Sequence, residues 1–186
     1  MDITVSDTEL PGVRLIEPTA FVDQRGFFME SYNKRRYAAA GIDVDFVQDN
    51  HSRSGANVVR GLHFQDQIAP QWRLVRCTQG AILDVVVDIR KNSATFGRWI
   101  GVKLTPDNRH QLLIPPEFAH GFAVLSETAE VQYKCSNFHN PAADRVISWN
   151  DPEIGIKWPI QNPVLSEKDQ TKGVGLSEYL RGNPFD

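Results

Sequence analysis

The sequence contains little cysteine and lacks the motifs of the common cofactor and metal sites. Only Cys77 and Cys135 occur among 186 residues, and each lies in an apolar, strand-like run. We therefore expect buried free thiols in a reducing compartment, with a single disulfide as the less favoured alternative. No Gly-x-Gly-x-x-Gly, Walker or Cys-x-x-Cys pattern is present, and the five histidines show neither the His-x-His nor the i,i+4 spacing of a metal site. The sequence thus predicts no metal and no nicotinamide or flavin cofactor.

Strong charge and long apolar runs are also missing. The formal net charge is −3, and the only cationic cluster is Lys34-Arg35-Arg36, so nothing indicates a nucleic-acid surface. No apolar run approaches the roughly 20 residues of a membrane-spanning helix. Residues 1–7 lack the basic and apolar regions of a signal peptide. We expect a cytoplasmic, soluble protein with neither a nucleic-acid nor a membrane partner.

What the sequence does contain is a series of short β-type runs separated by turn signals. Such spacing is typical of a β-sandwich or barrel, and the length fits a single domain, residues 1–186. One short helix is predicted between Asn33, its N-cap, and Ala40, with Gly41 as its stop. From about residue 140 on, five prolines interrupt regular structure, so this segment is predicted to be a wrapping tail with short helices. The expected strands are 13–16, 27–30, 45–49, 58–65, 73–79, 81–89, 98–104, 111–114, 120–125 and 130–136.

Alternation within the strands indicates which side chains share a face. In residues 82–89, four apolar side chains alternate with Asp84 and Asp88. In the run near residue 133, Val131, Tyr133 and Cys135 share one face. Tyr133 is therefore predicted to point inward, where its hydroxyl needs a hydrogen-bond partner.

The run Arg60-Gly61-Leu62-His63-Phe64-Gln65 carries the most informative pair of side chains. A histidine in a strand can move protons near neutral pH, and an arginine close by can hold an anion. Strict alternation puts Arg60 and His63 on opposite faces. If both serve one site, Gly61 must mark a bulge or twist. Taken alone, His63 and His120 fit a core position as well as a catalytic one.

Seven motifs in one order resemble the dTDP-4-dehydrorhamnose 3,5-epimerase family over roughly residues 10–170. They are Asp23–Glu30, Val47–Asn50, Arg60–Gln65, Leu83–Arg90, Phe118–Phe122, Tyr133–Cys135 and Leu165–Asp169. The resemblance implies an all-β fold, a cupin-type jelly-roll sandwich with a few short peripheral helices. It also implies a homodimer with exchanged N-terminal strands and no metal or organic cofactor.

The resemblance further implies a reaction and the residues that carry it. Family members epimerise a 4-keto-6-deoxy nucleotide sugar at C3 and C5, where the neighbouring ketone lets the anion delocalise as an enolate. By resemblance His63 is the base and Asp169 orients it, while Tyr133 donates a proton from the opposite face. Arg25, Arg60 and Lys168 match positions that bind the nucleotide diphosphate or its surroundings. The nucleotide-contacting set is Glu30, Gln48, Asp49 and Asn50, and His120 lines the sugar pocket.

The chain departs from the family pattern at several places. Arg73 stands where the family has a lysine beside the sugar ketone, and Trp72 adds bulk next to it. Asp144 replaces a family glutamate in the substrate-binding set, and residues 137–140 differ from a tyrosine-rich family stretch. Two alternatives therefore stay open. One is epimerisation at C3 or C5 only, or of another nucleotide sugar such as a GDP or CDP sugar. The other is a cupin that binds a nucleotide sugar without catalysis.

Overall fold

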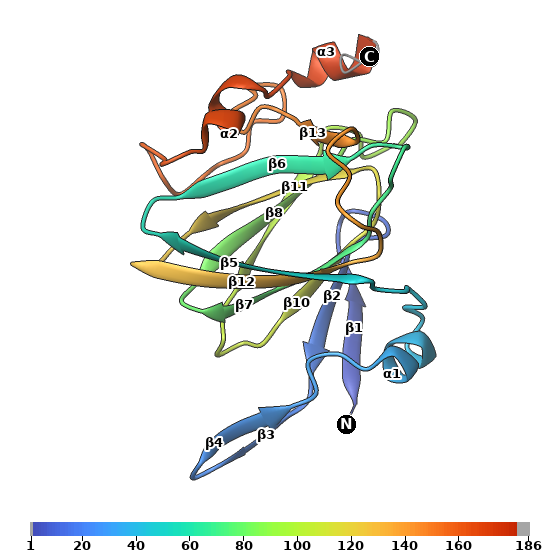
Figure 1. The fold of residues 1–186 in the computed structure, drawn as a ribbon, viewed down its shortest axis with the longest axis vertical. Helices are drawn as coiled ribbons and strands as arrows, with labels where there is room; N and C mark the ends of the chain where they lie inside the picture. Colours follow the sequence, from blue (N-terminus) through green and yellow to red (C-terminus); the bar gives the residue numbers. More distant parts are fainter. Residues whose placement is uncertain (1, 182–186) are drawn as a thin grey trace.

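The structure, a computed structural model, describes residues 2–181 and is built from two antiparallel sheets that face each other (Figure 1). The six-stranded sheet has the order β1 (Ile3–Asp7), β2 (Arg14–Pro18), β10 (Gln111–Ile114), β7 (Arg73–Gln79), β12 (Thr128–Cys135) and β5 (Gln48–Gly55). The five-stranded sheet has the order β13 (Asp144–Val146), β6 (Val59–Gln65), β11 (Phe118–Val124), β8 (Ile82–Asp88) and β9 (Trp99–Leu104). The predicted all-β sandwich is confirmed.

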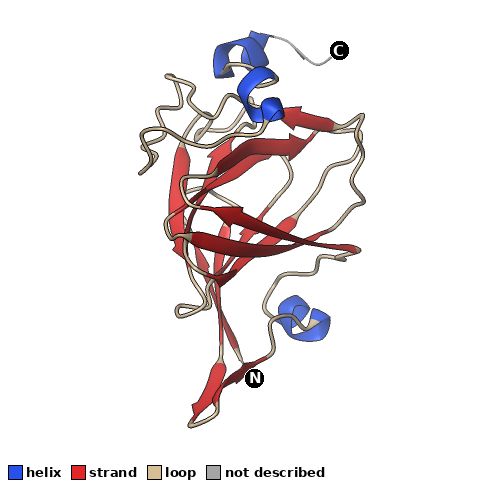
Figure 2. Cartoon of the chain, turned by 60° about the vertical axis from the view of Figure 1, so that its left-hand side comes forward, coloured by secondary structure: helices blue, strands red, loops and turns tan. Residues whose placement is uncertain are grey.

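Three short helices and a hairpin complete the described chain (Figure 2). Helix α1 (Lys34–Ala39) begins after Asn33, whose side chain accepts a hydrogen bond from the Arg36 amide, and the chain turns away at Gly41 with φ 83°. These caps are the predicted ones. Helices α2 (Glu167–Thr171) and α3 (Leu176–Arg181) lie in the C-terminal segment, and β3 (Ala20–Asp23) pairs with β4 (Gly26–Met29). None of the helices in residues 2–181 is long and apolar enough to cross a membrane.

Some strand boundaries differ from those predicted. The strand expected at 45–49 is β5, which begins at Gln48 and runs to Gly55. Its sequence is polar throughout, so it carries no apolar alternation. Its pairing with the whole of β12 makes it a strand. Strand β1, which was not predicted, is held in the same way by pairing with β2.

The apolar residues form layers on both faces of each sheet. Between the sheets, Val75 and Val131 of one sheet pack with Val86 and Phe122 of the other. Tyr133 packs against this cluster, so its predicted inward orientation is confirmed. Cys77 and Cys135 are both buried and free, as expected.

The C-terminal segment covers the outer face of the five-stranded sheet. The cluster on this face contains Val85 and Val87 of β8 and Ile89, which follows that strand. These side chains pack against residues of the C-terminal segment, including Ile154 and Leu176. Backbone hydrogen bonds join Ile147 to Leu62 in both directions, at 2.9 and 3.2 Å. Further along, Val164 hydrogen-bonds to Asn57 and Val59, which returns the chain to the start of β6 just before α2 begins.

A bulge at Gly61 brings Arg60 and His63 onto the same face of β6. Opposite them on β11, His120 pairs with His63 and Phe122 pairs with Arg60, so three steps on β6 match two on β11. Gly61 has φ 137°, and a Cβ there would lie 2.6 Å from the Gly121 Cα. The predicted bulge is confirmed, and both the conformation and the close approach require glycine.

Gly61→Ala is expected to destabilise the fold more than Gly26→Ala, although both glycines have positive φ. A Cβ on Gly26, at φ 120°, meets no atom within 4 Å, so that substitution carries only backbone strain of about 1 kcal/mol. At Gly61 the strain adds to a backbone clash, and we expect a loss of at least about 3 kcal/mol in the free energy of unfolding. Urea denaturation of both variants measures the difference; equal losses would show that the close approach to Gly121 does not matter.

Candidate active site

His63 and Asp169 form the centre of a polar cluster at β6. His63 Nε2 lies 2.5 Å from Asp169 Oδ1, and the Gly61 amide donates to the other carboxylate oxygen at 3.4 Å. Asp169 stands in the first turn of α2, where its own amide donates to the Ser166 side chain at 3.1 Å. The cap on α2 thus fixes the carboxylate that orients the imidazole.

The ionisation of Asp169 is favoured by these contacts. Burial raises its pKa, but the hydrogen bond and the charge of His63, together with the Gly61 amide, more than offset that effect. The pKa of Asp169 therefore lies below its usual value. An ionised carboxylate on Nε2 leaves Nδ1 as the imidazole nitrogen that can take up a proton.

His120 and Asp84 form a second imidazole–carboxylate pair on the same inner face. His120 stands directly opposite His63 in the strand register, and its Nε2 lies 2.8 Å from Asp84 Oδ1. Both side chains are buried, and Asp84 Oδ2 has no hydrogen-bond partner among the described residues. Asp84 was absent from the predicted site, although it lies on the polar face of β8 within a family motif.

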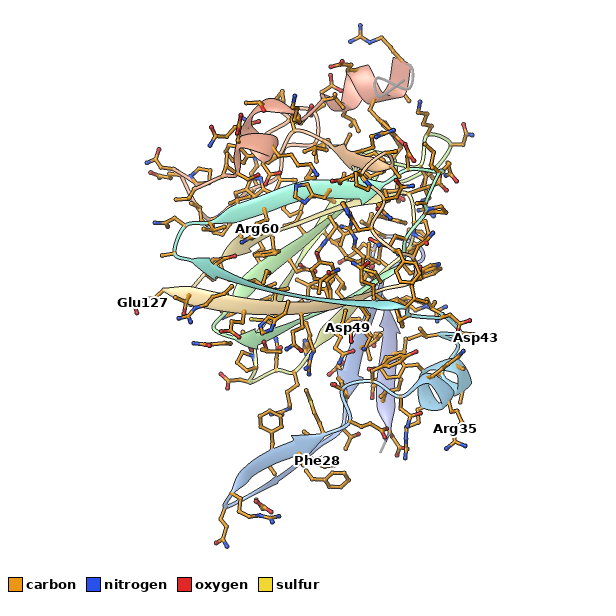
Figure 3. The ribbon with its side chains drawn as sticks, in the orientation of Figure 1. Phe28, Arg35, Asp43, Asp49, Arg60 and Glu127 are labelled. Atoms are coloured by element: carbon orange, nitrogen blue, oxygen red, sulfur yellow. The ribbon has the colours of Figure 1, made fainter. Side chains whose placement is uncertain are left out.

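Tyr133 lies on the inner face of the sheet opposite His63, among positive charges. Burial raises the pKa of the Tyr133 hydroxyl, and the Arg73 and Arg60 guanidinium groups act against that shift. Arg60 donates from Nε to Ser54 Oγ on β5 at 3.0 Å, which carries its side chain across the gap between the sheets (Figure 3). The site therefore joins a carboxylate-oriented imidazole, a protonated phenol and two cations.

Arg73 occupies the first position of β7 on the inner face. It stands opposite Cys135, and its Nη1 donates to the His63 carbonyl oxygen at 3.1 Å. Trp72 points the other way, because it packs with Leu74 in the cluster beneath α1. The expectation that Trp72 adds bulk beside Arg73 is therefore wrong: strand alternation separates the two side chains.

Asp144 and Lys168 meet next to the His63–Asp169 pair. Lys168 Nζ forms an ion pair with Asp144 Oδ2, and His139 Nε2 lies 3.5 Å from the same oxygen. Burial raises the pKa of Asp144, but the Lys168 and His139 contacts more than offset it, so its pKa lies below the usual value. His139 was not among the predicted site residues. The one feature of the sequence that pointed to it was the departure of residues 137–140 from the family pattern.

The predicted nucleotide-contacting residues of β5 divide between its two faces. Gln48 and Asn50 share the inner face, where Gln48 Nε2 donates to Asn50 Oδ1 at 3.1 Å and Asn50 contacts Cys135. Asp49 lies on the outer face and pairs with Lys134 at 2.8 Å (Figure 3). The structure thus brings Gln48 and Asn50 to the inner face but leaves Asp49 apart.

Two further predicted residues lie away from the cluster within this chain. Arg25 is at the tip of the β3–β4 hairpin, which projects from the sandwich at the end opposite β6 and α2, and its guanidinium bonds only to Asp23 among the described contacts (Figure 1). Glu30 pairs with Arg36 of α1 at 2.8 Å. The fold of one chain therefore does not join Arg25 and Glu30 to His63.

Comparison with known proteins decides the family. The model of the dTDP-4-dehydrorhamnose 3,5-epimerase family matches residues 7–175. The Escherichia coli K12 dTDP-4-dehydrorhamnose 3,5-epimerase is 53% identical over 181 residues, which cover 96% of this chain and 97% of that protein. The chain belongs to the dTDP-4-dehydrorhamnose 3,5-epimerase family.

Solved structures in this epimerase family share the fold described above. The Legionella pneumophila epimerase in complex with dTDP-4-keto-L-rhamnose superposes with a TM-score of 0.89 at 44% identity, covering 94% of this chain and 93% of that one. This confirms the cupin-like β-sandwich. A 3'-monoepimerase from Streptomyces bikiniensis in complex with dTDP-quinovose gives a TM-score of 0.88 at 31% identity, covering 94% and 88%. The shared fold therefore accommodates both double and single epimerases.

Asp169→Asn is expected to lower stability at neutral pH more than at acid pH. The folded-state pKa of Asp169 lies below the reference value of 3.8, so the ionised carboxylate stabilises the fold above that value. This contribution is lost as the pH falls through the folded-state pKa. Thermal unfolding between about pH 7 and pH 3 should show a difference from wild type that narrows on acidification. Asp107→Asn, at an exposed position, controls for net charge. A stability difference between wild type and Asp169→Asn that stayed constant with pH would contradict the lowered folded-state pKa of Asp169.

Proposed function

We propose that the chain is an isomerase that converts dTDP-4-dehydro-6-deoxy-D-glucose to dTDP-4-dehydro-L-rhamnose. The reaction moves hydrogens at C3 and C5, the two carbons adjacent to the C4 ketone. The observation that carries the proposal is the placement of His63, oriented by Asp169, and Tyr133 on facing sheets of an epimerase-family chain. Inversion at carbon needs such a base on one side and a proton donor on the other.

The reaction follows from these positions. His63 Nδ1 removes the proton from the carbon next to the ketone, and the hydrogen bond to Asp169 stabilises the imidazolium that forms. The electron pair delocalises onto the ketone oxygen, and the guanidinium groups of Arg73 and Arg60 stabilise that negative charge. Tyr133 then returns a proton from the opposite face. Because burial raises its pKa, its hydroxyl is protonated at neutral pH, as a donor must be.

We assign the substrate contacts by chemistry. Arg60 and Lys168 are suited to the diphosphate, since charged donors bind phosphate oxygens strongly. Gln48 and Asn50, on the inner face of β5, offer amide groups to the base, and His120 contacts the sugar. Asp144 contacts the substrate through its place between Lys168 and His139. Asp49 keeps only a peripheral part, as it lies on the other face of β5.

The proposal predicts hydrogen exchange at two carbons. In deuterium oxide, wild type should replace hydrogen by deuterium at C3 and C5, as followed by proton NMR, and His63→Ala should not. Tyr133→Phe should lower kcat by about 10²–10⁴-fold with little change in KM, because the hydroxyl acts when the carbanion is reprotonated.

The alternatives give different outcomes in the same assay. Exchange at a single carbon would establish a monoepimerase. Exchange only with GDP or CDP sugars would show that the substrate carries one of these nucleotides in place of dTDP. An absence of exchange with every 4-keto nucleotide sugar would favour a binding protein without catalysis. Turnover by His63→Ala at the wild-type rate would remove the base from the mechanism.

We also propose a cytoplasmic homodimer with exchanged N-terminal strands. Phe21, Val22, Phe27 and Phe28 on the projecting hairpin are 53–69% exposed. Such an apolar surface on a protruding element is typical of an interface. Docking on a second copy would cover these side chains and carry Arg25 and Glu30 to the partner's His63 cluster. Two buried free thiols suit a reducing compartment.

Mixing two inactive variants tests this arrangement. If Arg25 serves the partner's site, a heterodimer of Arg25→Ala and His63→Ala contains one complete site and one doubly impaired site. After subunit exchange at equal concentrations, activity should recover to about a quarter of wild type, since half of the dimers are mixed and each has one working site. Size-exclusion chromatography verifies the dimer. Recovery no greater than the sum of the two separate variants would place Arg25 in its own chain's site.

A further inference from the structure

The Arg73 side chain connects the two sheets at the catalytic cluster. It starts from β7, in the six-stranded sheet, and its Nη1 donates 3.1 Å to the carbonyl oxygen of His63 in the other sheet. Its charge also acts on Tyr133, which stands two residues from Cys135, the direct partner of Arg73 in the register. Arg73 thus contacts the backbone of the proposed base and acts on the proposed donor through its charge.

A second contact holds the guanidinium from the side. Arg73 Nε donates to Gln71 Oε1 at 3.2 Å, and Gln71 Nε2 donates to the Asn137 carbonyl at 2.8 Å. Gln71 is buried, with an exposed fraction of 8%. Two hydrogen bonds next to it fix the same two segments to each other. The Ser136 amide donates to the Trp72 carbonyl oxygen, and the Trp72 amide donates to Ser136 Oγ. The amide of Gln71 therefore has a fixed orientation before it meets Arg73.

We propose that Gln71 is a positioning residue that holds the Arg73 guanidinium in the orientation used in the reaction. The inference rests on the proposed function, because Arg73 acts there on the ketone oxygen. Arginine has five N–H donors in a rigid fork, and the bonds to Gln71 and His63 use two of them. The other three are presented in a fixed direction. A long side chain ordered before substrate binds loses less freedom in the transition state.

The proposal links Gln71 to the identity of residue 73. Lysine carries its donors only on the terminal ammonium and has no N–H at the position of the arginine Nε. Gln71 can therefore hold an arginine from the side, but not a lysine in the same way. Its contribution should accordingly depend on Arg73, which a double-mutant cycle measures.

The cycle compares wild type, Gln71→Met, Arg73→Lys and the double variant. Methionine is unbranched, so it fills the space of glutamine without its polar groups. We expect Gln71→Met to lower kcat by about tenfold or more in the wild-type background, as for loss of a hydrogen bond to a charged group, and to lower it less than about twofold in the Arg73→Lys background. KM should change little in either background. Equal fold-losses in both backgrounds, or no loss in wild type, would overturn the proposal.

Gln65→Met is the matched control. Gln65 is also buried, and it anchors the same loop through the Phe138 carbonyl and the Asn140 amide, but it has no hydrogen bond to Arg73. Gln65→Met should change kcat by the same factor in the wild-type background and in the Arg73→Lys background. A Gln65 effect that depended on residue 73 as strongly as the Gln71 effect would show general loop damage and refute the role of Gln71.

A measurement on the unmodified protein decides the matter even if Gln71→Met does not fold. The Arg73 Nε–H signal in an NMR spectrum, assigned by its loss in Arg73→Lys, should exchange slowly with solvent because Gln71 holds it. Rapid exchange, like that expected for the exposed Arg35, would contradict the proposal. This readout needs no substrate, so it is independent of the C3 and C5 exchange that tests the proposed function.

Discussion

The hydrogen bond between His63 and Asp169 is the contact on which the rest of the site depends. Its partners are 106 positions apart in the sequence, so the chain must return to β6 after completing both sheets. The segment after β13 accomplishes this by packing its apolar side chains, such as Ile154 and Leu176, on the outer face of β8 and β11. Apolar burial on the outer face thus determines where a carboxylate stands on the inner face.

The interior of the sandwich contains an unusual concentration of ionisable groups. Asp84, His120 and Asp169 are all buried, and burying a charge is unfavourable unless it is paired. The fold meets this condition by placing each carboxylate against an imidazole that projects from a neighbouring strand. Arg60, Arg73 and Lys168 place cationic groups beside these pairs, and such groups suit the phosphates of an anionic nucleotide sugar. The polar interior therefore serves the proposed chemistry, and the pairing of its charges makes their burial compatible with a stable fold.

The sequence predicted the parts of this arrangement that leave a local pattern. Alternation identified the inward face of Tyr133, and the glycine between two functional side chains indicated the bulge at residue 61. Strand β5 left no such pattern, because its structure comes from pairing with β12. Asp169 was found only through family resemblance, since no local feature links it to His63. Gln71, which lies in a loop and contacts Arg73 only after folding, gave no signal.

The replacement of a family lysine by Arg73 is the point where local pattern and tertiary structure have to be considered together. Judged by sequence alone, the larger guanidinium beside a tryptophan suggested crowding. In the fold, alternation turns Trp72 to the outer layer and leaves the inner face to Arg73. There the guanidinium finds acceptors that are already fixed, the His63 carbonyl and the Gln71 amide oxygen. An arginine held in this way supplies positive charge at a fixed place. A lysine ammonium on a flexible side chain would reach that place only in some of its rotamers. The substitution thus changes how the charge is positioned and leaves its sign unchanged, as the proposed enolate chemistry requires.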